Sequence, residues 1–269
     1  MIKDITIGQF FPGKSIVHRL DSRIKLLLTV MFIIMLFMAD TFLGLLIGVL
    51  FIGTAYIVSS IPLKMILKSV KPIVPLIILT AVLNLFFIST GDVLVHWWIF
   101  KITTGSLKTA VFMIIRIIAL IVGTSLLTYT TSPIALTDAI ERILSPLKKI
   151  KLPVHEVAMM MTIALRFIPT LVEETDKITM AQKARGADME SGSLLKRAKA
   201  LIPILIPLFV SAFRRAEELA MAMECRCYHG GEGRTRLKQL HFAMRDLYAV
   251  IISAIPIVLI IIVDRVNIF

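Results

Sequence analysis

The chain has 269 residues, of which 57% are hydrophobic, and it carries a formal net charge of +12. A soluble domain is usually about 45–50% apolar, so this composition excludes an ordinary soluble domain and indicates an integral membrane protein. In such a protein the side of the membrane on which Lys and Arg gather is more informative than the nucleic-acid binding that a basic soluble chain would suggest.

Long apolar runs predict five membrane-spanning helices, several of them at the short end of the roughly 17–25 residues that a crossing requires. We expect these helices at 24–39, 42–59, 72–89, 107–129 and 247–263. Residues 1–23 mix charges with single apolar residues, so no cleavable signal peptide is visible there. The predicted fold is an all-α integral membrane protein, with about five transmembrane helices plus a cytoplasmic module of two long amphipathic helices.

The orientation follows from the basic residues in the short connections, because these residues collect on the cytoplasmic side. One side holds most of them: Lys3, Lys14, Arg19, Arg23, Lys25, Lys64, Lys68 and Lys71. The other side offers Lys101, Lys108 at its edge, and Arg265 in the tail. We therefore expect the N-terminus inside and, after five spans, the C-terminus outside.

The chain divides by composition into a cytoplasmic N-terminal segment, four spans, a charged cytoplasmic module, and a last span with a short tail. The predicted boundaries are 1–23, 24–130, 131–245 and 246–269. Within the module we expect a short helix over 133–149 and two longer helices, one from Pro153 to a left-handed glycine cap at Gly186, the other from about residue 203. Apolar residues recur at spacings of three and four in both. The two stripes should pack on each other or beneath the spans, with their polar ends at one surface.

Two local patterns resemble ligand sites without the context that those sites need. Residues 8–15 fit the phosphate-loop pattern G-x4-G-K-[ST], but a membrane span follows and no series of alternating strands and helices does. Cys225 and Cys227 are separated by one residue, whereas paired zinc ligands usually have at least two between them, and only His229 and His241 lie nearby. We expect neither nucleotide nor metal to bind, and no catalytic constellation stands out.

A charged residue lies inside the fourth predicted span. Arg116 is flanked by isoleucines, and Asn84 in the third span is a candidate hydrogen-bond partner. A charge at membrane depth marks either a functional pathway or a structural pair in the bundle interior. Both interpretations stay open from the sequence. A second structural expectation is a salt bridge from Arg166 to Glu173 or Glu174 on a neighbouring turn.

Two basic helix ends are the most informative feature of the module. They are Ala184-Arg185-Gly186 and Cys225-Arg226-Cys227, each closing a long amphipathic segment. A single arginine at such a position commonly complements the helix dipole. Two of them in consecutive helices, each flanked by small residues, favour a docking role, because a guanidinium binds carboxylates bidentately.

At these residues the sequence resembles the transmembrane T component of energy-coupling factor (ECF) transporters, the EcfT/CbiQ family, whose hallmark is two Ala-Arg-Gly motifs ending two coupling helices. The first motif is intact at 184–186, and the second keeps only Arg226. Residues 8–10 through 18–21 and residues 230–235 also look like the family's. Because cysteine adopts a left-handed cap less readily than glycine, we expect the second helix to run past Cys227 and stop at Gly230.

The resemblance implies a non-catalytic coupling subunit in a bacterial or archaeal cell membrane. Each arginine-bearing end would sit in a groove on one of two ABC-type ATPase subunits, which bind the ATP. Their motion would tilt a separate membrane-embedded S component that holds a vitamin or a trace metal ion. The alternative from the same broad class is a conventional ABC-type permease that lines its own substrate pathway. A membrane-bound enzyme is a third reading, which would need clustered acids or histidines at one membrane face.

Overall fold

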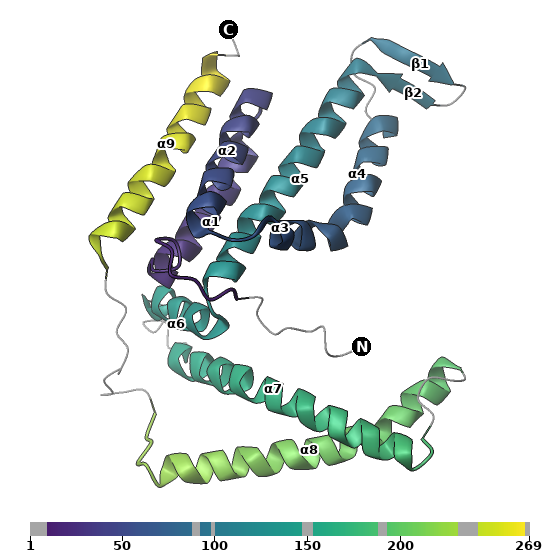
Figure 1. The fold of residues 1–269 in the computed structure, drawn as a ribbon, viewed down its shortest axis with the longest axis vertical. Coiled ribbons are helices and arrows are strands. Elements are labelled where there is room, and N and C mark those ends of the chain that lie inside the picture. The colour runs from purple at the N-terminus through teal and green to yellow at the C-terminus, as the bar shows by residue number, and fades with distance from the viewer. Residues whose placement is uncertain are drawn as a thin grey trace. The chain divides into compact units, whose positions relative to one another are not determined.

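The computed structural model describes residues 10–87, 92–97, 100–146, 153–187, 193–230 and 242–266. Its helices and strands follow the chain in the order α1 (Ser22–Met38), α2 (Phe42–Ser59), α3 (Leu63–Val70), η2 (Lys71–Ile73), α4 (Val74–Phe87), β1 (Val93–Trp97), β2 (Phe100–Thr103), α5 (Thr104–Thr130), α6 (Pro133–Ile143), α7 (Val154–Ala184), α8 (Leu194–Glu224) and α9 (Met244–Val266). Figure 1 shows these elements as a ribbon. The all-α prediction is confirmed, with the strands β1 and β2 as its exception among the described residues.

The chain forms two compact units. The bundle unit comprises the described residues up to Ala139 and from Phe242 onward, and the crossed-helix unit comprises those from Ile140 to Gly230. The predicted module, 131–245, is longer than the crossed-helix unit at both ends. Its start differs because α6 begins in the bundle unit and ends in the crossed-helix unit.

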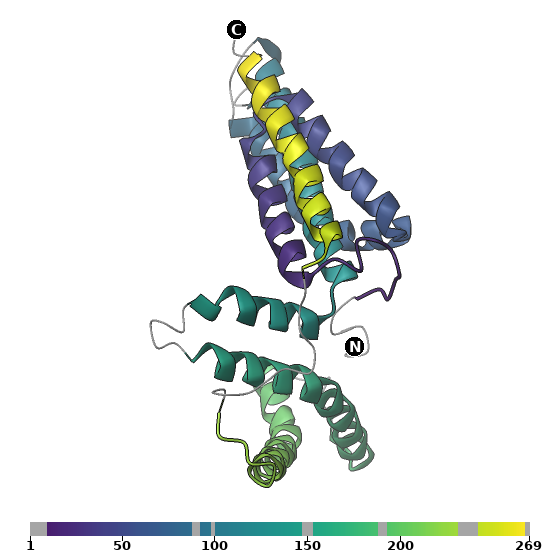
Figure 2. The same cartoon turned by 90° about the vertical axis from the view of Figure 1, so that its left-hand side faces the viewer.

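The bundle unit is built around α1, α2, α5 and α9, whose axes run side by side in both views (Figures 1 and 2). Its core is almost entirely apolar, and α1 supplies much of it, including Phe32 and Leu36. The helices approach closely where a glycine meets a large side chain. A Cβ on Gly123 of α5 would lie 2.0 Å from the Phe32 ring, and a Cβ on Gly48 of α2 would lie 2.7 Å from Leu36. These small residues allow the backbones to approach.

Carboxylates of α9 bind backbone at both ends of the α1–α2 hairpin. At one end Asp246 accepts the backbone N–H of Asp21 at 2.9 Å, and Asp21 is itself the N-cap of α1. At the other end Asp264 accepts the Thr41 hydroxyl at 2.5 Å and the Asp40 N–H at 3.1 Å. We call Asp246 and Asp264 the α9 carboxylates. Because they bind opposite ends of the hairpin, α1 and α9 run parallel, and the start of α1 and the end of α9 lie at opposite ends of the bundle.

The third predicted span, 72–89, corresponds to η2 and α4 in the structure. A short amphipathic helix, α3, comes first, and η2, with Pro72 in its first turn, leads into α4. Figure 1 shows α3 lying across the bundle direction, whereas α4 follows it. The connection between α4 and α5 was predicted as a loop and contains an antiparallel hairpin of β1 and β2. A capping box between Thr103 and Ser106 then starts α5.

Five described helical stretches are long and apolar enough to cross a membrane, so the protein is a multi-pass membrane protein. They are Phe42–Ser59, Leu63–Phe87, Thr104–Thr130, Val154–Ala184 and Met244–Val266. This set differs from the five predicted spans in one member, because it contains α7 and lacks α1. The helix α1 has only 17 residues, close to the lower limit of about 17 for a span, yet it packs in the centre of the bundle. The helix α7 qualifies although it was predicted outside the membrane, with the lowest mean hydropathy of the five, 1.3.

The crossed-helix unit consists mainly of α7 and α8, each with 31 residues. As predicted, α7 follows Pro153 and contains Pro169. The predicted start of α8 at about 203 is wrong, because the helix begins at Leu194 and carries Pro203 and Pro207 in its interior. At the start of α7, His155 Nδ1 lies 3.1 Å from the buried carboxylate of Glu141 on α6, so this contact links the two helices.

Candidate functional site: two arginine-bearing helix ends

The two predicted arginine motifs have the same backbone structure. After α7, the N–H of Ala187 donates to the Gln182 carbonyl and that of Gly186 to the Lys183 carbonyl. After α8, the N–H of Tyr228 donates to the Met223 carbonyl and that of Cys227 to the Glu224 carbonyl. This paired bond pattern defines a Schellman motif. In both motifs the arginine immediately precedes the left-handed residue.

The residue in the left-handed position differs between the two ends. Gly186 has φ 87°, as predicted for a glycine cap, and Cys227 has φ 55°. The prediction that the second helix runs past Cys227 to Gly230 is therefore wrong, since α8 ends at Glu224. Left-handed backbone disfavours a residue with a Cβ by about 1–2 kcal/mol. The hydrogen bonds of the motif hold Cys227 there nonetheless.

All six residues of the two motifs are exposed, namely Ala184, Arg185, Gly186, Cys225, Arg226 and Cys227. Among the described residues, neither Arg185 nor Arg226 has a hydrogen-bond or ion-pair partner. Each guanidinium lies at the negative end of a long helix dipole, which favours its charge. Each also keeps its full set of donors for a carboxylate of another molecule.

The helices α7 and α8 cross in antiparallel fashion, and the crossing point is fixed by side chains. Arg215 of α8 forms an ion pair with Glu174 of α7 at 2.7 Å. Gln182 also donates to the Pro203 carbonyl at 3.5 Å. The predicted pairing of Arg166 with Glu173 or Glu174 is wrong, because Glu174 instead binds across to the other helix. The ion pair therefore connects the helices rather than stabilising one of them.

The crossing divides the helix pair into two arms of equal length. Arg185 lies 11 residues after Glu174, and Arg226 lies 11 residues after Arg215. At about 1.5 Å per residue each arm is roughly 16 Å long. Because the helices are antiparallel, the arms extend in opposite directions from the ion pair (Figure 1). The two arginine motifs therefore lie at separate ends of the helix pair.

The sequence contains a signal for this crossing that helical periodicity does not reveal. Glu173-Glu174 precedes Arg185 by the same number of residues as Arg214-Arg215 precedes Arg226. Acidic residues in one helix and basic residues in the next, at equal distances from the motifs, predict an antiparallel ion pair. Helical periodicity alone gives no register between two helices.

One face of α8 remains apolar and exposed. It includes Leu205, Phe209 and Phe213, which are 46%, 61% and 67% exposed. The two rings stack on each other with centroids 6.5 Å apart. Of the two packing surfaces expected for this stripe, α7 and the underside of the spans, α7 does not cover these three residues. An exposed apolar patch of this kind marks a surface for another protein or for lipid.

The predicted intramembrane pair is not formed. Arg116 of α5 donates to the carbonyl of Ala39, the C-cap of α1, and its guanidinium lies 4.6 Å from the centre of the Phe112 ring. Asn84 donates to the Thr80 carbonyl one turn earlier in its own helix, at 2.9 Å. The physical reason is that the last carbonyls of α1 have no partner within the helix, so the guanidinium of Arg116 can satisfy one of them. The structural interpretation of Arg116 fits this contact.

The phosphate-loop pattern has a different role in the structure. Gly8 and Gln9 lie outside the described residues. The Ser15 hydroxyl donates to His18 Nδ1 at 2.7 Å, and His18 Nε2 donates to the Phe11 carbonyl at 3.0 Å. Burial, aided by the charge of Lys25, lowers the pKa of His18 against the opposing effect of its backbone bond, so the ring stays neutral. The serine that would bind a metal–phosphate complex is engaged in a local turn.

The two cysteines form no metal cluster with the described residues. Both are free and exposed. His241, the furthest of the candidate ligands, lies outside the described part of the chain, as do residues 231–235 of the resemblance.

Comparisons with known proteins agree with one another across almost the whole chain. Residues 13–237 match the family model CbiQ, described as cobalt transport protein. The energy-coupling factor transporter transmembrane protein EcfT of Ruminiclostridium cellulolyticum is 55% identical over 247 residues, covering 92% of both chains. The proteins of the same name from Bacillus subtilis and Lactococcus lactis subsp. cremoris are 46% and 44% identical, covering 95% and 99% of this chain and 96% and 100% of their own.

The chain carries both arginine ends in two long crossed helices and also contains a multi-pass helical bundle, and its matches extend over most of its length. It therefore belongs to the EcfT/CbiQ family of transmembrane transport proteins.

Proposed function

We propose that this chain is the transmembrane T component of an ECF-type importer of vitamins or trace metal ions. It passes the motion of two ABC-type ATPase subunits to a membrane-embedded S component that binds the substrate. The relatives named EcfT support its place in an energy-coupling factor transporter. ATP binding and hydrolysis belong to the ATPase subunits in this proposal, and the chain itself needs no cofactor.

The observation that carries the proposal is the equal spacing of Arg185 and Arg226 from the Glu174–Arg215 ion pair. A pair of related ATPase subunits offers two similar grooves on either side of an axis. Two helix ends of the same backbone structure at equal distances from a fixed crossing suit such a pair, one arginine in each groove. When the ATPases close, the arms are drawn together and α7 and α8 change their crossing angle.

The exposed apolar face of α8 provides the second contact that coupling requires. It belongs to the helix that ends in the Arg226 motif, so motion of that end also moves this face. We assign it as the contact for the S component, because a membrane protein offers a complementary apolar surface.

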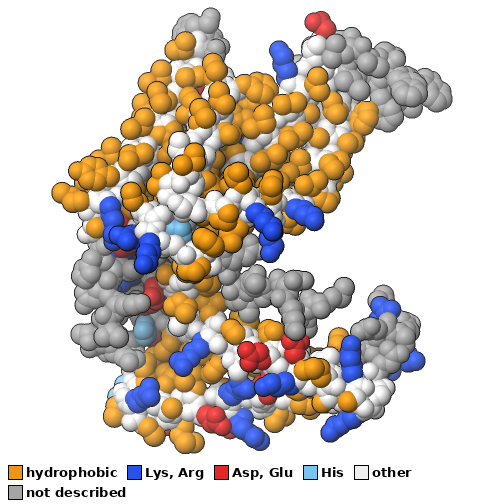
Figure 3. Space-filling view, viewed as in Figure 1, with side chains coloured by type: hydrophobic (Ala, Val, Ile, Leu, Met, Phe, Trp, Pro, Cys, Tyr) orange, Lys and Arg blue, Asp and Glu red, His pale blue; other side chains and the backbone are white. Residues whose placement is uncertain are grey.

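The proposed location is the bacterial or archaeal cell membrane, with the N-terminus inside and the C-terminus outside. The termini of α1 and α9 lie at opposite ends of the bundle, as an odd number of spans requires. Lys and Arg side chains gather along one end of the bundle unit, below a face that is otherwise hydrophobic (Figure 3). That end carries the starts of α1 and α9 together with α3, and the positive-inside rule assigns it to the cytoplasm. In this proposal α7 and α8 are cytoplasmic, which suits the charges along the second half of α7.

The test replaces both arginines by Glu and follows ATPase co-purification and substrate uptake. Removing one partner of a buried charge pair weakens association by about 2–5 kcal/mol, so the double variant Arg185→Glu/Arg226→Glu should lose both. The matched control is Arg166→Glu/Arg214→Glu, which changes two exposed arginines in the interiors of the same helices. Normal uptake by the first variant, with correct insertion, contradicts the proposal.

The permease alternative needs polar groups facing a pathway between the spans. Both of its candidates, Arg116 and Asn84, are hydrogen-bonded to backbone carbonyls. Reconstitution with the ATPases but without a third membrane protein separates the two functions, because uptake in that mixture would require a permease.

A further inference from the structure

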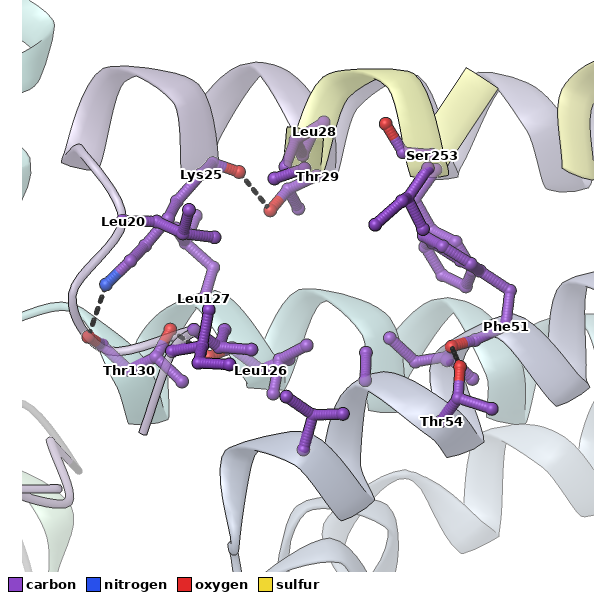
Figure 4. Close-up of a pocket in the computed structure, with 18 of the residues that line it drawn as sticks. Leu20, Lys25, Leu28, Thr29, Phe51, Thr54, Leu126, Leu127, Thr130 and Ser253 are labelled. Atoms are coloured by element: carbon purple, nitrogen blue, oxygen red, sulfur yellow. Dashed lines mark hydrogen bonds between the residues drawn. The ribbon is translucent and has the colours of Figure 1, made fainter. Parts of the chain in front are cut away.

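A large cavity lies inside the bundle unit, between α1, α2, α5 and α9. Its volume is about 500 Å³, within the range of about 300–1,000 Å³ typical of ligand pockets. The segment before α1 closes part of one end through Ile16, Val17 and Leu20. Figure 4 shows side chains from these helices around the open space.

The wall of the cavity offers almost nothing polar to a ligand. Leucine, isoleucine and phenylalanine side chains make up much of it. Four serine and threonine side chains also line it, and each hydroxyl donates to a carbonyl of its own helix, three or four residues earlier. These bonds run from Thr29 to Lys25, from Thr54 to Phe51, from Thr130 to Leu126 and from Ser253 to Val250, at 2.7–2.9 Å. With these donors used internally, the wall suits a hydrocarbon rather than a polar solute.

The lining also carries positive charge toward one end. Lys25 is buried, and its ammonium group donates to the carbonyls of His18 at 3.0 Å and Thr130 at 2.8 Å, which leaves one donor. Arg245, in the first turn of α9, is exposed and has no hydrogen-bond or ion-pair partner among the described residues. Tyr248, one turn further along, is 62% exposed. An aromatic and a basic side chain at such a position are typical of the membrane–water interface.

We propose that this cavity holds one acyl chain of an anionic membrane phospholipid, whose phosphate lies against Arg245 and the end of the cavity marked by Lys25. Apolar walls and cationic residues near one end match the two parts of that molecule. The surrounding bilayer supplies acyl chains at high local concentration. The lipid would fill space between the spans and so support the packing of α1 against α9 without taking part in substrate transfer. This inference does not depend on the proposed coupling function.

The acyl-chain part is tested with the full-length protein in nanodiscs that contain phosphatidylglycerol and phosphatidylcholine. Native mass spectrometry after release should show one retained phosphatidylglycerol per chain. Ala249→Phe places a ring in the cavity and should lower retention by about tenfold, equivalent to about 1.4 kcal/mol. Ile255→Phe is the matched control, because this residue is exposed on the same helix and does not line the cavity.

The head-group part is tested by Arg245→Gln, with Arg265→Gln in the last turn of α9 as its control. The first variant should reduce the preference for phosphatidylglycerol over phosphatidylcholine by about two- to fivefold, as expected for an exposed ion pair. The control should keep it. Should Ala249→Phe fail to fold, Ala55→Leu narrows the same cavity from α2. Wild-type protein without retained lipid, or equal retention after cavity filling, overturns the proposal.

Discussion

The ends of α7 and α8 reach the same backbone structure from different sequences. Gly186 adopts the left-handed position without a Cβ, whereas Cys227 adopts it with one. The residue preference at this position is therefore not what the two ends share. They share an arginine one residue earlier and the pair of N–H bonds that turns the chain away from the helix. The feature common to both ends is therefore the position of Arg185 and Arg226, each one residue before the left-handed residue.

The largest expected effect tests whether the two ends are equivalent. Arg185→Glu and Arg226→Glu, made singly, should each weaken ATPase binding by about 2–5 kcal/mol, and by similar amounts because the arms are equal. Retention of each ATPase subunit on the tagged chain, measured by quantitative mass spectrometry, checks this. If one variant loses ATPase and the other keeps all of it, the two ends do not have equivalent roles.

A smaller effect is expected from a β-branched residue in the left-handed position. Gly186→Val should destabilise the end of α7 by about 1–3 kcal/mol, since φ 87° strains any residue with a Cβ. Ala184→Val, two residues earlier in the helix, should change stability by only about 0.5 kcal/mol. Hydrogen exchange of residues 180–187 measures both. Equal exchange in the two variants would mean that this strain is absent.

The two cysteines allow a test with opposite signs. Cys227→Gly should stabilise the end of α8 by about 1 kcal/mol, because it removes the Cβ from a left-handed residue. Cys225 has helical backbone, φ −60°, so Cys225→Gly should destabilise that end by about 0.5–1 kcal/mol. Hydrogen exchange at residues 221–228 should therefore slow in one variant and quicken in the other.

The smallest effect concerns the ion pair between the arms. Glu174→Gln should lower stability by no more than about 1 kcal/mol, because the pair is partly exposed and screened by solvent. A double-mutant cycle with Arg215→Gln isolates the interaction, and its coupling energy should fall as salt is raised. A coupling well above this value, insensitive to salt, would assign the pair a larger share in holding the crossing.

Local patterns in the sequence predicted what local chemistry decides. Apolar runs located four of the spans, and Gly186 marked the end of α7. The end of α8 was misplaced because the cysteine there is held by hydrogen bonds that residue preference does not encode. The start of α8 was predicted too late, because the helix begins at Leu194 and continues through Pro203 and Pro207. Local patterns do not predict which distant segments lie side by side. Asp21 and Asp246, which are 225 residues apart, each resemble an ordinary acidic residue at a helix start, and nothing in the sequence links them.

The α9 carboxylates also bear on how the protein is made. The N–H of Asp21 and the Thr41 hydroxyl donate to carboxylates that are synthesised more than 200 residues later. Until α9 enters the membrane, the α1–α2 hairpin lacks both of these hydrogen bonds and the side-chain packing that α9 provides. Closure of the bundle is therefore a late event of biogenesis. In a nascent chain that stops before Met244, the α1–α2 hairpin stays exposed to quality-control proteases.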